Sequence, residues 1–290
     1  KTRVGWWKNG YPEFFAKVLN SPNWIGIGVE IDGVELDLHT CKLHNFHREL
    51  NMKEGTLSRS FTVSCEEGKN IEVNTMRFLS IVDDEIGAIR YSVKPLNFDG
   101  KIVFTPYIDG NVNNRDSNYD EHFWKLVDSA AKEGEAVLVS KTRKSDFSAA
   151  FSMKYDLDIE GAYIETPAEV MHREEKVGNR IKCNVKTGET ATLYKYVSVV
   201  SSMNYPEKVL INAGKKSLEQ AYTKKFDQLL TEHKQKWEDN WSHSDIIIEG
   251  DAKAQQGIRF NIFHLNQTYS GKDERLNIGP KGFTGEKYGG

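Results

Sequence analysis

Apolar and polar residues alternate along most of the first two thirds of the chain. Residues 25–31 alternate in this way, and Asp32 and Gly33 then turn the chain into a second alternating stretch at 34–38. The pattern recurs in nine further stretches: 57–65, 71–82, 88–93, 102–107, 136–141, 147–157, 162–170, 181–185 and 191–200. Many strands at short spacing, with no helical periodicity between them, predict a large antiparallel β-sandwich.

The periodicity changes after residue 211. Over residues 215–241 the apolar positions advance by three or four, which predicts a long helix with one buried stripe: Leu218, Tyr222, Phe226, Leu229, Leu230, His233, Trp237 and Trp241. A second predicted helix has Asp251 as its N-cap and a buried face of Ala254, Ile258, Ile262, Leu265 and Tyr269. We therefore predict a β-sandwich domain over 1–211, a helical linker over 212–250 and the start of a helical domain over 251–290.

Composition and charge exclude several classes of protein. Lys and Arg number 39 against 42 Asp and Glu, so the formal net charge of -3 argues against a broad nucleic-acid-binding surface. The sequence has no apolar run of the ~20 residues that a membrane-spanning helix requires. We also expect no secretory signal, because the first residues contain no apolar h-region. Cys41, Cys65 and Cys183 lie far apart without a CxxC pair, so we expect no disulfide framework and a cytoplasmic location.

Residues 109–120 are a polar stretch that follows a predicted strand. Oxygen-bearing side chains at alternate positions resemble a calcium loop, but Asn114 stands where an EF-hand needs Gly and Asp120 where it needs a bidentate Glu. A long polar loop at the edge of the sandwich is the favoured interpretation, and such loops often form binding surfaces. The candidate loop contacts are Asp109, Asn111, Asn113, Asp116, Asn118 and Tyr119.

Two other clusters have a structural and a functional interpretation. The close spacing of His39, Cys41, His44 and His47 could suggest zinc, but no second ligand pair lies nearby, so we predict ordinary packed or surface residues and no metal site. An aromatic cluster near the start favours a small core or a subunit contact over sugar stacking: Trp6, Trp7, Tyr11, Phe14, Phe15 and Trp24.

The last twelve residues, 279–290, contain five glycines. Glycine lets backbone N–H groups approach a ligand closely, and Lys281, Glu286, Lys287 and Tyr288 supply polar side chains. The pattern alone leaves a binding loop and an irregular connection equally open. No GxSxG or HExxH signature occurs in the sequence, and spacing singles out no pair of carboxylates for acid–base catalysis.

Several segments resemble glycoside hydrolase family 65. Residues 256–269 (QGIRFNIFHLNQTY) and 276–290 (LNIGPKGFTGEKYGG) are similar to the start of its catalytic domain, up to the segment that leads into a Trp-Asp-Thr-Glu motif. Residues 1–15, 21–27 and 107–121 are similar to the branch of the family that acts on maltose. The resemblance implies a galactose-mutarotase-like β-sandwich, linker helices and the first part of an (α/α)6 barrel. It also implies further sandwich residues before Lys1 and most of the barrel after Gly290.

The resemblance implies inverting phosphorolysis of maltose to β-glucose 1-phosphate and glucose, with inorganic phosphate as co-substrate and no metal or organic cofactor. Trehalose, kojibiose and nigerose are alternative substrates, and a non-catalytic module for carbohydrate binding or dimerisation is the alternative function. The general-acid Glu is expected beyond Gly290, so no catalytic residue is assigned here and Glu286 belongs to an entrance loop. A homodimer is expected, and the expected substrate-binding residues are Lys281, Gly282, Phe283, Thr284, Gly285, Glu286, Lys287 and Tyr288.

Overall fold

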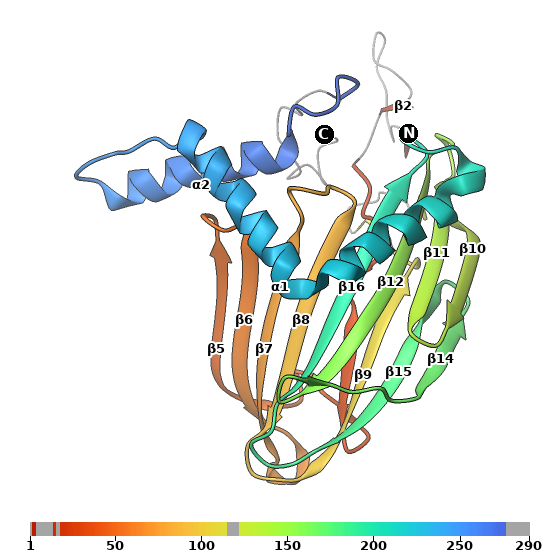
Figure 1. Cartoon of the computed structure of the whole chain (residues 1–290), viewed down its shortest axis with the longest axis vertical. Helices are drawn as coiled ribbons and strands as arrows, with labels where there is room; N and C mark the ends of the chain where they lie inside the picture. The colour runs from red at the N-terminus through yellow and green to blue at the C-terminus, as the bar shows by residue number, and fades with distance from the viewer. Residues whose placement is uncertain (1, 4–13, 16–17, 115–121, 277–290) are drawn as a thin grey trace.

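Alternating side chains build two antiparallel sheets that pack face to face. The structure is a computed structural model that describes residues 2–3, 14–15, 18–114 and 122–276. The larger sheet has nine strands in the order β10-β11-β12-β16-β8-β7-β6-β5, with β13 paired to β12 (Figure 1). The smaller sheet has five strands in the order β14-β15-β9-β3-β4, and β1 and β2 form a separate pair. This arrangement confirms the predicted β-sandwich.

The strands of the larger sheet are β5 (Lys42–Asn51), β6 (Thr56–Ser64), β7 (Asn70–Leu79), β8 (Ile86–Pro95), β10 (Trp124–Lys132), β11 (Glu135–Thr142), β12 (Ser148–Ile159), β13 (Ala162–Tyr163) and β16 (Ala191–Ser201). Those of the smaller sheet are β3 (Ile27–Ile31), β4 (Val34–Glu35), β9 (Gly100–Asp109), β14 (Ala168–Arg173) and β15 (Lys176–Val185). The remaining elements are β1 (Thr2–Arg3), β2 (Phe14–Phe15), the 3-10 turns η1 (Glu66–Gly68) and η2 (Glu207–Val209), and the helices α1 (Leu210–Ser244) and α2 (Ala252–Thr268).

The core lies between the two sheets. Every second residue of a strand points to the same face, so the inner faces contribute Val63, Ile71, Val93, Phe104 and Leu193, all fully buried. The predicted hairpin at 25–38 forms β3 and β4, with Gly33 at a φ of 90° in the turn between them. That left-handed conformation favours glycine, because a Cβ atom would strain the backbone.

One buried lysine joins the two sheets. Lys195 of β16 has no exposed surface, and its ammonium donates hydrogen bonds to the carbonyl oxygens of Trp24 at 2.6 Å, Gly26 at 2.9 Å and Tyr107 at 2.7 Å. An ammonium has three donors, and here each donor has one backbone acceptor. Burial lowers the pKa of Lys195 well below its usual value. The three carbonyl oxygens compensate for the burial of the charge by taking the place of water.

Helix α1 covers the outer face of the larger sheet. Its buried residues include Leu218, Phe226, Leu229, His233 and Trp237, which confirms the predicted stripe. The helix is interrupted at Lys225, whose φ of 60° and ψ of 170° are not helical. The carboxylate of Asp156 accepts from the Lys225 ammonium at 2.7 Å and from the Tyr222 hydroxyl at 2.5 Å, so it contacts the interruption and the helical turn before it. Within the described residues, no helix is both long and apolar enough to cross a membrane.

Several predicted boundaries are wrong, for identifiable reasons. Strands β5 and β10 are missed because most of their residues are exposed, so apolar alternation is weak there. The single strand predicted at 162–170 is two short strands that belong to different sheets. In α2 the buried residues are Ile262 and Phe263, of which Phe263 stacks on Trp237 of α1, whereas Ala254 and Leu265 are exposed.

Two of the three free cysteines lie close together in space. Cys41 and Cys65 are 24 positions apart in the sequence, yet their Sγ atoms are 2.9 Å apart. They precede and follow two paired strands, β5 and β6, so the antiparallel pairing brings them together. Their separation in sequence is therefore no guide to their distance in space.

We expect Lys195→Met to lower the free energy of unfolding by roughly 3 kcal/mol, because three buried carbonyl oxygens lose their donor. Urea unfolding followed by circular dichroism measures the change. Lys182→Met is the matched control, since Lys182 lies half-exposed on β15 and its nearest carboxylate oxygen is 3.8 Å away. Equal unfolding midpoints for the two variants would show that Lys195 is not the link between the sheets.

Candidate functional site

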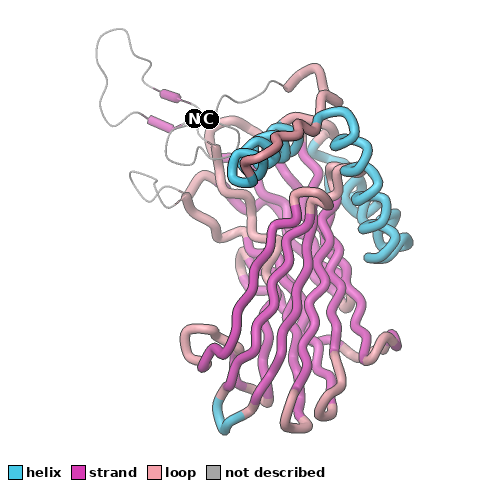
Figure 2. Tube along the Cα trace, turned by 90° about the vertical axis from the view of Figure 1, so that its left-hand side faces the viewer, coloured by secondary structure: helices cyan, strands magenta, loops and turns pink. Residues whose placement is uncertain are grey.

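The candidate site lies at one end of the sandwich, where four connections meet. We call it the loop end and define it by residues 80–85, 109–114, 202–206 and 271–276. Ser198 pairs with Ile86, so the last residues of β16 lie beside the start of β8. The bond from Lys195 to the Tyr107 carbonyl brings the end of β9 to the same place. Figure 2 shows the helices at this end and the η1 turn at the opposite end.

The predicted polar loop starts at this end. The backbone of Asp109 pairs with that of Asn23, and its Oδ1 atom accepts from the Asn111 N–H at 3.0 Å. The ammonium of Lys176 is 3.8 Å from the other carboxylate oxygen of Asp109. Asn111 and Asn113 are exposed, so their amide groups remain available to a ligand. The structure thus brings Asp109, Asn111 and Asn113 together, as expected for one loop.

Asn114 has a structural role in the same loop. It is buried, accepts from the Asn20 N–H at 3.0 Å and donates to the Val18 carbonyl at 2.9 Å. These bonds attach the loop to residues 18–23. The other predicted loop contacts lie outside the described residues: Asp116, Asn118 and Tyr119.

Within the loop end, two cationic side chains attach segment 272–275 to the connections 80–85 and 202–206. The ammonium of Lys272 donates to the Ile81 carbonyl at 3.2 Å and to Asp84 at 2.9 Å. The guanidinium of Arg275 donates to the Met203 carbonyl and to the Asn204 side chain, both at 2.6 Å. The chain therefore leaves residue 276 from a defined position at the loop end.

The Arg275 guanidinium also pairs with Asp273 and lowers the pKa of that carboxyl to about 2. The predicted substrate-binding residues follow this segment in the sequence and lie outside the described residues: Lys281, Gly282, Phe283, Thr284, Gly285, Glu286, Lys287 and Tyr288.

His233 connects α1 to two turns of the larger sheet. Its Nδ1 atom accepts from the Ile81 N–H at 3.2 Å, so Nε2 carries the proton and donates to the Gly55 carbonyl at 3.1 Å. Only the neutral ring can make both bonds. Burial lowers the pKa of His233, in agreement with this neutral state. One turn further along, Trp237 stacks on Phe263 of α2 at 4.8 Å between ring centroids.

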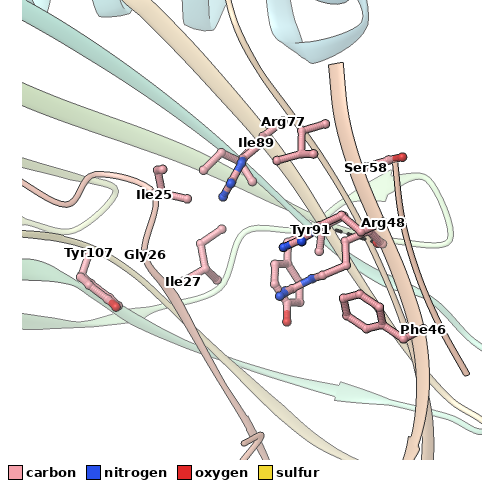
Figure 3. A pocket seen from close by; sticks show the side chains of 13 residues that line it. Ile25, Gly26, Ile27, Phe46, Arg48, Ser58, Arg77, Ile89, Tyr91 and Tyr107 are labelled. Atoms are coloured by element: carbon pink, nitrogen blue, oxygen red, sulfur yellow. Dashed lines mark hydrogen bonds between the residues drawn. The ribbon is translucent and has the colours of Figure 1, made fainter. Parts of the chain in front are cut away.

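A cationic cleft opens on the inner face of the larger sheet. Its cavity of about 340 Å³ is lined by Arg48, Arg59 and Arg77 together with the rings of Tyr91 and Tyr107 (Figure 3). No described residue that lines it carries a carboxylate. Arg48 stands directly opposite Arg59 across β5 and β6, where like charges repel. Burial, together with Arg59 and Arg48, lowers the pKa of Arg77. The lining charge is therefore positive and unbalanced. The sequence pattern does not reveal this cleft, because its arginines occupy ordinary alternating positions of the strands.

The other sequence candidates have separate surroundings. His44 bonds to Ser64, and His47 lies 3.6 Å from Glu49, so these two side chains do not share a centre. Among the residues that the structure describes, no three His, Cys, Asp or Glu side chains are grouped to hold a metal ion. The Trp24 ring packs against the core near Phe151 and Val197, which supports the small-core interpretation at that position. The side chains of the other five aromatic candidates lie outside the described ones.

Comparison with known proteins gives a consistent family assignment. Residues 1–240 match the N-terminal domain of glycosyl hydrolase family 65, and residues 259–290 match the central catalytic domain of that family. A maltose phosphorylase of Bacillus subtilis is 42% identical over all of this chain, which covers 38% of that protein. An alpha,alpha-trehalose phosphorylase of Thermoanaerobacter brockii is 34% identical over 97% of this chain, and the match covers 38% of that protein.

A solved structure supports the fold. A human-microbiome protein to which kojibiose phosphorylase activity has been ascribed superposes with a TM-score of 0.84 over 94% of this chain, at 24% identity. The chain spans 35% of that protein. The same sandwich and helices therefore occur in a much longer polypeptide.

We expect acid to weaken the docking of α1, because protonated His233 cannot accept from Ile81. The pKa of His233 is lower in the folded state than the usual ~6.5 of an unfolded chain, so the unfolded state binds the proton first as pH falls. Stability is thus complete above about pH 6.5 and declines below it, by roughly 1 kcal/mol at pH 5.5.

Urea unfolding at pH 7.5 and pH 5.5, on the unchanged protein and on His233→Gln, measures this contribution. The substitution does not alter Lys234 or Glu54, which form the neighbouring ion pair at 2.9 Å, so the comparison isolates the histidine ring. The pH dependence should be weaker in His233→Gln, and identical pH dependence would contradict the assignment.

Proposed function

The chain belongs to glycosyl hydrolase family 65, and from that premise we propose that the protein that contains it phosphorolyses a glucose disaccharide, with maltose as the substrate. The observation that carries the proposal is the 42% identity to a maltose phosphorylase over the full length of this chain. The similarity to trehalose and kojibiose phosphorylases is lower, at 34% and 31%. Disaccharide phosphorolysis is common to these relatives, and maltose is the finer part of the proposal.

The chemistry explains why a phosphorylase needs only one acid–base carboxyl group. An inverting hydrolase uses one carboxylic acid to protonate the leaving oxygen and a second carboxylate to activate water. Inorganic phosphate is already an anionic nucleophile, so it attacks the anomeric carbon from the opposite face without that second group. The products from maltose are β-glucose 1-phosphate and glucose. This reaction requires neither a metal nor an organic cofactor, and we assign the general acid to no residue of this chain.

We propose that the loop end helps to place substrate-binding residues at the active site of the full-length protein. Lys272 and Arg275 fix the segment that precedes residues 281–288, which are the proposed disaccharide contacts. Asp109, Asn111 and Asn113 start a second polar loop at the same end, and we propose that it reaches an active site within a homodimer. The division of the chain at residues 211 and 250, and a cytoplasmic location, stay predictions.

The substrate is tested by incubating the purified full-length protein with maltose, trehalose, kojibiose or nigerose, with and without inorganic phosphate. We expect glucose release from maltose only when phosphate is present, with β-glucose 1-phosphate formed in equal amount. The 290 residues alone should show no turnover, because only residues 259–290 match the catalytic domain. Release of glucose without phosphate, or faster cleavage of another disaccharide, would contradict the proposal.

Arg275→Met tests the role of the loop end in the full-length protein. The side chain of Arg275 makes the bonds to Met203 and Asn204 that hold segment 272–275 at the loop end. Its loss should raise KM for the disaccharide roughly threefold to tenfold with little change in thermal stability, because misplaced binding groups weaken substrate contacts. The matched control is Arg173→Met, an exposed arginine on β14. If the two variants have the same KM, segment 272–275 does not position a substrate-binding group.

A further inference from the structure

Helix α1 contacts the edge strand β5 at the turn end of its hairpin. Within the described residues this strand pairs with β6 alone, and nine of its ten residues are exposed. At its turn end, α1 holds the hairpin: the Trp241 indole donates to the Met52 carbonyl at 3.0 Å, and His233 bonds to Gly55. An exposed edge strand is prone to fraying and to pairing with other chains. Whether β5 frays therefore depends on the contacts at the opposite, open end of the hairpin.

Two thiols meet at that open end. Cys41 and Cys65 are one position beyond the last register pair, Lys42 with Ser64, and their sulfur atoms are 2.9 Å apart. Each is fixed by its own turn, because the Cys41 N–H donates to Asp37 and the Cys65 N–H to Lys69. A disulfide has a sulfur–sulfur distance of about 2.05 Å, so closing the bond needs a movement of less than ~1 Å.

We propose that Cys41 and Cys65 form a redox modification site, which a low-molecular-weight disulfide converts into an internal disulfide that clamps the open end of the β5–β6 hairpin. The proposal is independent of the phosphorylase activity. In the reduced state this end of β5 is held by non-covalent bonds alone, namely the backbone ladder and the His44–Ser64 bond, whereas the oxidised pair closes a loop between residues 24 positions apart. Together with the contacts of α1, the disulfide would secure the edge strand at both ends.

The reaction takes place in two balanced steps. The thiolate of Cys41 attacks one sulfur of glutathione disulfide, which forms a mixed disulfide and releases one glutathione thiolate. The thiol of Cys65 then loses its proton and attacks the Cys41 sulfur, which forms the internal bond and releases the second glutathione. The two protein thiols are oxidised by two electrons in total, and one glutathione disulfide is reduced to two glutathione molecules.

The surroundings of the three thiols indicate which cysteine reacts first and which one can serve as a control. Burial and the neighbouring Cys41 raise the pKa of Cys65 to about 12, so Cys65 is a poor first nucleophile and oxidation should be faster at higher pH. Cys183 is buried on β15 with its sulfur 3.6 Å from the Ile102 carbonyl, and burial raises its pKa to about 11. It has no partner cysteine, because the other two of the three belong to the pair. Cys183→Ser is therefore the matched control variant.

The test exposes the purified 290-residue chain to glutathione disulfide at pH 8.5 and counts free thiols after denaturation. We expect the count to fall from three to one, with a mass lower by two hydrogens and a Cys41–Cys65 cross-linked peptide. Cys183→Ser should also lose two thiols. Cys41→Ser should retain its thiols, and Cys65→Ser should accumulate a stable glutathione adduct on Cys41.

Hydrogen exchange then tests the clamp. Amides of β5 near residue 42 should exchange more slowly after oxidation, the melting temperature should rise by several degrees, and dithiothreitol should reverse both changes. Three free thiols after exposure to the oxidant, or a glutathione adduct in the unchanged chain that never resolves, would overturn the proposal. So would an oxidised chain whose β5 amides exchange as fast as those of the reduced chain.

Discussion

The arrangement of the two sheets depends on the buried ammonium of Lys195. Its three hydrogen bonds reach from β16 in the larger sheet to the carbonyls of Trp24, Gly26 and Tyr107 on the smaller side. Apolar packing between sheets is not directional, whereas these bonds fix one relative position. Gly26 is required for the same contact, because a Cβ atom there would lie 2.2 Å from the Tyr107 ring. The end of β9, and hence the polar loop that follows it, is placed by this contact.

Helix α1 connects the larger sheet to the loop end. The interruption at Lys225 lies in a backbone region that side chains rarely adopt, and the ion pair with Asp156 offsets part of the strain. Beyond the interruption, His233 receives the Ile81 N–H, and Ile81 also accepts from Lys272. One connection, residues 80–85, therefore contacts both α1 and the segment that precedes residue 277. A single bent helix thus links the larger sheet to segment 272–275, which precedes the proposed substrate-binding residues in the sequence.

The sequence predicts the parts of this structure that depend on periodicity. Inner-facing residues such as Val63 and Leu193 alternate, and the α1 stripe advances by three or four, so the sandwich and the long helix are evident. Lys195 is not evident, because a lysine in a strand normally faces solvent and its acceptors are 88 to 171 positions away. The same limit hides the Cys41–Cys65 pair, since strand register and not spacing brings it together.

The net charge of the chain does not determine the charge of an individual cleft. The formal net charge of -3 describes the whole chain and argues against a broad basic surface. Register nevertheless places Arg48, Arg59 and Arg77 on one inner face, where no lining carboxylate balances them. Attraction of an anion depends on such local groups in a partly buried cleft, where screening by water is weak. A near-neutral composition therefore argues against a broad nucleic-acid-binding surface but leaves recognition of a specific anion open, and strand pairing shows where the cationic side chains gather.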